Sequence, residues 1–108
     1  MLPGFIDTHM HIGETIPYVF AAALGPGMSP EQLVAAIAEH AAAYPEQNPV
    51  IGTGFLGAAF GDLGPTAAEL DRAVPDRPAM IFDEGFHSAW INSKAMEMVG
   101  LTADSPDP

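Results

Sequence analysis

Apolar residues recur with helical spacing in one stretch of the chain and fill short continuous runs in others. Leu33, Ile37 and Ala41 lie four residues apart, which places them on one face of a helix. The preceding residues, 29–32, read Ser-Pro-Glu-Gln and combine an N-cap serine, a proline at the first helical position and a glutamine that closes a capping box. Pro45 interrupts the pattern, so we predict a helix over residues 29–44.

Three apolar runs have the length of strands. Residues 50–55 and 78–82 are two of them, and the second is uninterrupted, as expected when both faces of a strand are covered. The remaining run is the first in chain order: it is a short apolar strand within residues 2–13 that ends in a pair of histidines.

Two further helices are predicted in the second half of the chain. Residues 66–69 read Thr-Ala-Ala-Glu, a second capping box, and open a short helix that Pro75 ends. The last helix is expected to run over residues 88–98, with Gly100 as its C-terminal stop.

This alternation of strands and helices predicts an α/β fold with a parallel sheet. A closed (β/α)8 TIM barrel needs about 250 residues, so the chain could supply only about three of the β-α units. We therefore expect residues 1–108 to be a fragment of a larger barrel, with 101–108 a loop that is cut short. Ile6, Ile51 and Ile81 would then face the barrel interior without the strands that normally cover them.

The charge and composition of the chain argue against several classes of binding partner. The formal net charge is −11, and the three basic residues are scattered singly, so no patch can neutralise phosphates. Nucleic acid and membrane surfaces are not expected as partners. The chain has no run of apolar residues long enough to span a membrane and no secretory leader at its start, which favours a cytoplasmic location. With no cysteine, any metal ligand must be histidine or carboxylate.

The candidate chemistry lies in the first predicted strand. His9 and His11 are two residues apart and would project from the same face of a strand, with Cα atoms roughly 6.6 Å apart, so both imidazoles can reach one metal ion. Asp7 on the same face could orient a ligand, or it could instead accept a hydrogen bond from a nearby backbone N–H. The two histidines could also be ordinary polar side chains bonded to the backbone.

Two other features invite a functional interpretation. His87 follows the third apolar run, where a barrel carries its reactive loops, so it could contact substrate or simply cap a helix. Residues 52–57 satisfy the G-x-G-x-x-G pattern of dinucleotide-binding proteins. Gly61, Gly64 and Pro65 interrupt the helix that should follow, which speaks against a dinucleotide site.

Two separated motifs resemble one known family. Residues 3–11 read Pro-Gly-Phe-Ile-Asp-Thr-His-Met-His, and 70–82 with 87–108 carry Leu-Asp-x-x-x-Pro-x-x-Pro, His-x-x-Trp-x-Asn-Ser-x-Ala and Thr-x-x-x-Pro-Asp-Pro. Both resemble the amidohydrolase superfamily, and the second points to its family-3 branch, which includes N-substituted formamide deformylase-like enzymes. The chain departs from that branch at Gly85-Phe86, where the family often has Asp-Gly before the later histidine.

The resemblance implies an enzyme that hydrolyses non-peptide, amide-type C–N bonds of small molecules through a metal-activated water. It implies that His9 and His11 bind one or two divalent ions, zinc above others, with Asp7 behind them. The remaining ligands and the acid/base would come after Pro108, so we expect the fragment alone to be inactive. The alternative is a non-catalytic truncated module, stable only as an oligomer or with the remainder of a parent chain.

Overall fold

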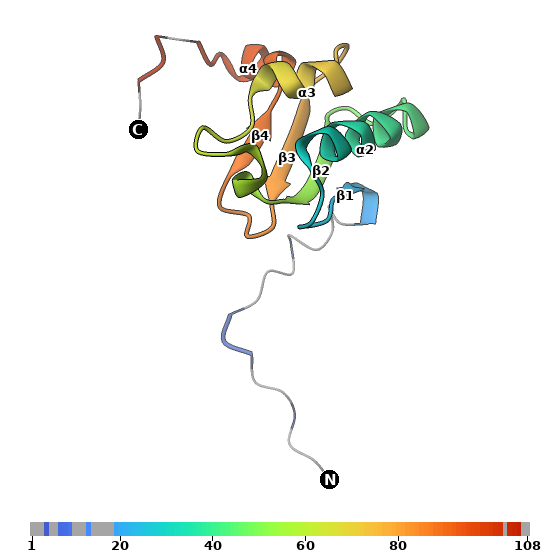
Figure 1. Cartoon of the computed structure of the whole chain (residues 1–108), viewed down its shortest axis with the longest axis vertical. Helices are drawn as coiled ribbons and strands as arrows, with labels where there is room; N and C mark the ends of the chain where they lie inside the picture. Colours follow the sequence, from blue (N-terminus) through green and yellow to red (C-terminus); the bar gives the residue numbers. More distant parts are fainter. Residues whose placement is uncertain (1–3, 5–6, 10–12, 14–18, 103, 107–108) are drawn as a thin grey trace.

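The computed structural model describes residues 4, 7–9, 13, 19–102 and 104–106. Within these residues the elements, in chain order, are β1 (Ala22–Ala23), α2 (Pro30–Ala43), β2 (Val50–Phe55), the 3₁₀ turn η2 (Gly57–Phe60), α3 (Ala67–Ala73), β3 (Ala79–Asp83), β4 (Ala89–Ile91) and α4 (Ser93–Val99). The strands form one sheet in the order β1-β2-β3-β4. Figure 1 shows α2 beside β1 and β2, and α3 with α4 at the end of the sheet where β3 begins. The predicted α/β class is confirmed.

The predicted caps determine where the helices begin. Ser29 accepts a hydrogen bond from the backbone N–H of Gln32, whose side chain accepts from the backbone of Ser29, so both halves of the first capping box are present. Thr66 and Glu69 form the second box ahead of α3. Gly100 ends α4 with a left-handed conformation, φ 73°, as predicted.

The prediction of a helix over residues 88–98 is wrong in its first half. Residues 89–91 instead form β4, which pairs antiparallel with β3, and α4 begins only at Ser93. The reason is Asn92, which is completely buried and caps α4 with its side chain, so the chain must be extended before it. The sheet is therefore parallel from β1 to β3, as the alternation of strands and helices predicts, and has an antiparallel fourth strand that the sequence did not predict.

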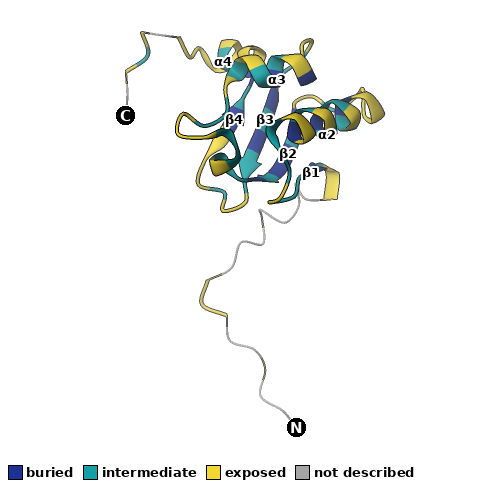
Figure 2. Ribbon diagram, viewed as in Figure 1, coloured by how far each residue is buried: buried dark blue, intermediate teal, exposed yellow. Residues whose placement is uncertain are grey.

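One hydrophobic core lies between the sheet and the helices. Its buried members come from α2, β2, α3, β3 and β4: Leu33, Ile37, Ala41, Val50, Phe55, Leu70, Ala73, Val74, Ala79, Ile81 and Trp90. Figure 2 shows these positions concentrated in the strands and on the inner side of α2. Phe55 and Trp90 lie edge to face with centroids 5.9 Å apart.

The register across the sheet decides which side chains enter this core. Gly52 is paired with Ala22 on one side and Ile81 on the other, so all three share the face that the helices cover. A Cβ on Gly52 would come within 2.8 Å of Ile81 Cδ1, so a larger residue there would require the Ile81 side chain to move. The prediction that Ile81 faces a barrel interior is therefore wrong, because Ile81 is fully buried on the helix side. Ile51 lies on the opposite face and is half-buried, whereas Ile6 lies outside the described residues.

The opposite face of the sheet carries a second set of side chains. Two rows cross it, Ile51–Met80–Ile91 and Ala23–Thr53–Phe82–Ala89. Most of these residues are half-buried or exposed, and Thr53 is the one that is buried. We refer to this surface as the open face of the sheet.

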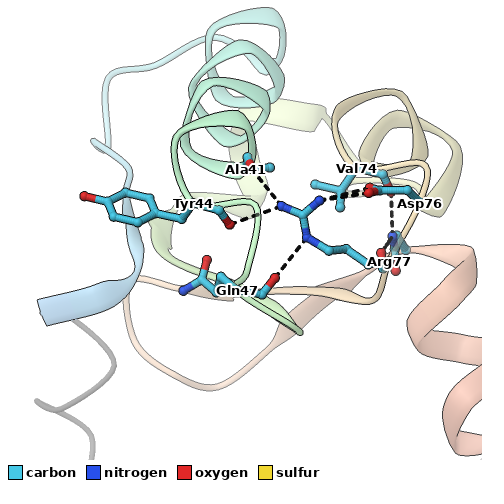
Figure 3. A network of polar contacts seen from close by, with 7 residues as sticks. Ala41, Tyr44, Gln47, Val74, Asp76 and Arg77 are labelled. Carbon is cyan, nitrogen blue, oxygen red and sulfur yellow. Dashed lines mark hydrogen bonds and ion pairs between the residues drawn. The ribbon is translucent and has the colours of Figure 1, made fainter.

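Arg77 ties the end of α2 to the segment that leads into β3 (Figure 3). Its guanidinium donates to the carbonyl oxygens of Ala41 at 2.7 Å, Gln47 at 2.9 Å and Tyr44 at 3.4 Å. It also pairs with Asp76 at 2.9 Å. The last carbonyls of a helix lack partners within the helix, and one arginine supplies several donors in a planar fork, so this contact closes the C-terminus of α2.

None of the helices in the described part of the chain is long and apolar enough to cross a membrane.

Candidate functional site

The carboxyl ends of β2 and β3 lie together at one edge of the sheet. These strands are parallel, and Phe55 at the end of β2 is in register with Asp83 at the end of β3. The backbone N–H of Glu84 donates to the carbonyl oxygen of Phe55 at 3.1 Å, which holds the turn after β3 against the end of β2. In α/β barrels this edge carries the reactive groups. We call the turn of residues 84–88, between β3 and β4, the mouth turn.

His87 lies in the mouth turn, as the sequence predicts for a residue after the third apolar run. Its backbone N–H donates to Asp83 Oδ1 at 2.8 Å, and the N–H of Ser88 donates to the same oxygen at 3.2 Å. His87 itself is exposed and begins no helix, so the helix-capping alternative does not apply to its side chain. Contact with substrate remains a prediction.

Asp83 organises this turn. Partial desolvation raises the pKa of its carboxyl group, but the hydrogen bonds from the backbone N–H groups of Ser88 and His87 outweigh that effect, and the net pKa is below its ordinary value. The carboxylate is therefore charged at neutral pH and stabilises the hairpin by accepting from two consecutive amides.

The histidine pair is only partly described. Asp7 Oδ1 accepts a hydrogen bond from the backbone N–H of His9 at 3.0 Å, and both residues are exposed. This contact corresponds to the alternative in which Asp7 satisfies a nearby N–H. Residues 7–9 include a bend rather than a strand, while His11 and most of the segment 2–13 that holds the first predicted strand lie outside the described residues. The distance between the two imidazoles is thus not part of the described structure.

The donor chemistry of this segment suits a zinc ion, because neutral imidazole nitrogen is among the ligands that zinc prefers. Within the part of the chain that the structure describes, no three histidine or carboxylate side chains come together as a metal-binding group. A metal site that includes His9 would therefore take its further ligands from residues outside the described ones or from water.

Phe86, in the mouth turn, has an unusual backbone. Its φ is +56°, in the left-handed region that glycine adopts freely and bulky residues avoid. Its ring stacks on that of Phe82 with centroids 5.3 Å apart and an angle of 26° between the planes. Glycine adopts such a positive φ without strain, so a phenylalanine is unusual at this position.

The G-x-G-x-x-G stretch has a structural explanation. Gly52 makes room for Ile81, and Gly54 has a φ of +102° at an irregularity in the pairing of β2 with β3. A Cβ on Gly54 would come within 2.5 Å of the carbonyl oxygen of Leu24. Gly57 opens a 3₁₀ turn rather than an α-helix, so no helix N-terminus is available for a pyrophosphate, as the sequence indicated.

Two residues of this edge, Thr53 and Asp83, were not singled out from the sequence, whereas Phe86 was noted only as a departure from the resembling family. Asp83 carried a weak signal, because an aspartate directly after an apolar run often accepts hydrogen bonds from the turn that follows. Thr53 is 2% exposed, and its hydroxyl has no hydrogen-bond partner among the described residues. The register places it on the open face of the sheet, and the sequence does not reveal that register.

Solved structures with the same fold define the class of protein. An uncharacterized metal-dependent hydrolase from Pyrococcus horikoshii superposes with a TM-score of 0.67 and 27% identity, over 95% of this chain and 20% of that protein. A metal-dependent hydrolase from Pyrococcus furiosus gives a TM-score of 0.64 with 28% identity, again over 95% of this chain and 20% of that protein. The open sheet is thus part of a barrel of the metal-dependent hydrolase type.

Sequence comparison places the chain within a family. Residues 1–108 match the amidohydrolase family along their whole length, and the chain belongs to it. It is 32% identical over 117 residues to the exoenzymes regulatory protein AepA of Pectobacterium carotovorum subsp. carotovorum. It is 29% identical over 111 residues to the N-substituted formamide deformylase of Arthrobacter pascens. The matches cover 100% of this chain but only 24% and 20% of those proteins.

Proposed function

We propose that the chain supplies the first part of the barrel of a zinc-dependent hydrolase that cleaves amide-type, non-peptide C–N bonds of small molecules. The observation that carries this proposal is the match to the amidohydrolase family over residues 1–108. It is supported by the metal-dependent hydrolases that share the fold and by the deformylase among the relatives. We also propose a cytoplasmic location and no nucleic acid or membrane partner, in keeping with the net charge of −11.

His9 and His11 are the proposed metal ligands. A zinc ion bound there would lower the pKa of a bound water and provide a nucleophile at neutral pH. Asp7 holds the backbone at His9 through its hydrogen bond to that N–H, so its role is to position the ligand segment. His87, exposed in the mouth turn, is proposed to contact substrate. The proton transfer to the leaving amine would need a group from outside residues 1–108.

The open face of the sheet supports a further part of the proposal. Ile51, Met80 and Phe82 are only half-buried there, although apolar side chains in the middle of a sheet are normally covered. We propose that further strands of the same longer protein cover them. The chain spans about a fifth to a quarter of its relatives, so those relatives have the length to supply such strands.

Zinc titration of the 108-residue chain tests the metal site. Isothermal calorimetry should detect weak zinc binding, because two imidazoles leave the other positions of the ion to water. Changing His9→Ala or His11→Ala should each abolish it. His87→Ala is the matched control, since it removes another exposed histidine and should leave the affinity unchanged.

An affinity for zinc that is the same in His9→Ala as in the unaltered chain would remove the assignment of the site. Loss of binding in His87→Ala alone would move the site to the mouth turn. Substitution of cobalt for zinc gives a second readout, because the absorption of the bound ion reports its coordination by nitrogen.

A further inference from the structure

The loop between η2 and α3 carries the most exposed large apolar side chain of the described residues. Leu63 is 96% exposed, and the loop that holds it follows the carboxyl end of β2. We call residues 61–64 of this loop the flap. A single exposed leucine is ordinary on a protein surface, but this one lies beside an apolar cavity. In barrel enzymes, loops at the carboxyl ends of strands include those that close during function.

The cavity next to the flap is open to solvent and has a volume of about 330 Å³. Gly64 of the flap is one of its lining residues, so the backbone beside Leu63 already forms part of its wall. The side chains in the rest of the wall include Phe55, Pro65, Trp90 and Met96. An apolar cavity of about 150 Å³ can hold a benzene molecule, so this larger cavity has room for the side chain of a leucine.

Two glycines with positive φ bound the flap. Gly61 has a φ of 77° and Gly64 a φ of 67°, and a Cβ added to either would meet no atom within 4 Å. The backbone therefore has space around it at both points, and glycine changes conformation there more easily than any other residue. The N–H of Gly64 donates to the carbonyl oxygen of Gly61 at 3.2 Å, so the flap is a single turn that can move as a unit.

The residues on both sides of the flap are attached to Trp90. The ring of Phe60 lies edge to face with that of Trp90, with centroids 5.1 Å apart. The indole N–H of Trp90 donates to the carbonyl oxygen of Thr66 at 2.7 Å. Because Trp90 itself lines the cavity, these two contacts hold the flap beside the cavity. The movement that would bring Leu63 into the cavity is thus confined to the short segment between Phe60 and Thr66.

We propose that the flap closes over this cavity and buries the side chain of Leu63 against Trp90 and Met96. Closure removes apolar surface of the leucine and of the cavity wall from water, which favours the closed state. The opposing cost is the conformational entropy of a short turn, which its own hydrogen bond already restricts. The described structure is then the open state. Closure depends neither on a bound metal ion nor on the proposed hydrolase activity.

Nuclear Overhauser spectroscopy of the 108-residue chain with labelled methyl groups tests the closure. In the open state Leu63 is 96% exposed, so its methyl groups should give no cross-peaks to the cavity wall. In the closed state they should give cross-peaks to the indole protons of Trp90 and to the terminal methyl group of Met96. We expect these cross-peaks, together with a displacement of the Leu63 methyl resonances by the nearby rings. Absence of the cross-peaks would overturn the proposal.

Filling the cavity provides the matched variant. Gly57 lines the cavity, its φ is outside the left-handed region, and a Cβ there would meet no atom within 4 Å. Gly57→Leu should therefore occupy the space and remove the cross-peaks of Leu63. Gly27→Leu is the control, because Gly27 has the same freedom but lies before α2 and outside the cavity wall. Cross-peaks that persist in Gly57→Leu, or that disappear in Gly27→Leu as well, would contradict the proposal. Should Gly57→Leu fail to fold, the cross-peaks of the unaltered chain still decide.

Discussion

Replacing Asn92 by alanine should remove much of the stability of this fold. Asn92 is completely buried, and its side chain makes four hydrogen bonds. Oδ1 accepts from the backbone N–H of Ala79 at 3.0 Å and of Ala95 at 2.9 Å. Nδ2 donates to the carbonyl oxygens of Val74 at 2.8 Å and Arg77 at 2.9 Å. One side chain therefore joins the end of α3, the start of β3 and the first turn of α4.

The magnitude follows from the groups that alanine leaves without partners. Loss of the N-cap on α4 costs about 1 kcal/mol. The N–H of Ala79 and the carbonyl of Val74 make buried bonds to Asn92, and each costs about 1–3 kcal/mol when left unsatisfied. The expected decrease in the free energy of unfolding is about 3–7 kcal/mol, a large part of the roughly 5–15 kcal/mol that is typical of a domain.

Urea unfolding followed by tryptophan fluorescence measures this directly, because Trp90 is the only tryptophan, is buried and lies two residues before Asn92. Thr66→Ala is the control: it removes an N-cap whose hydrogen bonds are exposed and should cost only about 1 kcal/mol. Asn92→Asp should also destabilise, since a carboxylate cannot donate to the carbonyls of Val74 and Arg77. If Asn92→Ala costs no more than Thr66→Ala, the reasoning about buried unsatisfied groups is wrong.

Three further changes test other parts of the structure. Arg77→Met should lower the unfolding free energy by about 2 kcal/mol, because three carbonyls lose a charged donor, and Arg77→Lys should recover only part of this in the same urea assay. The pKa of Asp83 is lowered in the folded state, so its carboxylate stabilises the fold above the ordinary pKa of 3.8. This stabilisation is lost as the pH falls through the lower pKa of the folded state. In thermal melting measured as a function of pH, Asp83→Asn should therefore lack this loss of stability at acidic pH. The 108-residue chain with added zinc should not hydrolyse N-formyl or N-acyl amides above background, and turnover abolished by His11→Ala would contradict this.

The sequence predicts correctly where helices begin and end when interactions between neighbouring residues decide it. Both capping boxes, the proline that follows α2 and the glycine after α4 act within one turn of the backbone, so residues such as Ser29 and Gly100 could be interpreted without tertiary information. The same holds for β2 and β3, whose apolar runs are long enough to be distinctive.

The antiparallel strand β4 could not be predicted in this way. Its three residues, Ala89–Ile91, are too few for a periodic pattern, and the following Ser-Lys-Ala-Met sequence has good helix formers that made the helix seem to begin earlier. Two long-range contacts make residues 89–91 a strand: their pairing with β3 and the burial of Asn92 against the end of α3. The antiparallel return also explains why α4 lies beside α3 rather than following β3 directly.

The residues of the candidate site also differ in whether the sequence alone reveals them. The histidine pair and His87 could be found from spacing and resemblance, because ligand chemistry is visible in residue type. The placement of Thr53 and the positive φ of Phe86 could not, because they depend on the strand register and on one backbone angle. A one-residue shift of β2 against β3 would move Thr53 to the helix side.

Self-association of the chain tests the proposal that further strands cover the open face. β1 and β4 are the edges of the described sheet, and the open face leaves Ile51, Met80 and Phe82 half-buried. Each apolar side chain left uncovered forgoes part of the roughly 1.5–3 kcal/mol that full burial provides. Yet Ile81, expected on the same face, is fully buried under the helices, so the loss of burial energy is smaller than the sequence suggested.

We still expect sedimentation equilibrium at micromolar concentration to show self-association of the 108-residue chain. Met80→Lys, which places a charge on the open face, should shift it towards monomer, whereas Met98→Lys, at an exposed position on α4, should not. A monomer that melts cooperatively would show that the helix-side core alone stabilises the fold, and the proposal that further strands cover the open face would then lose its energetic basis.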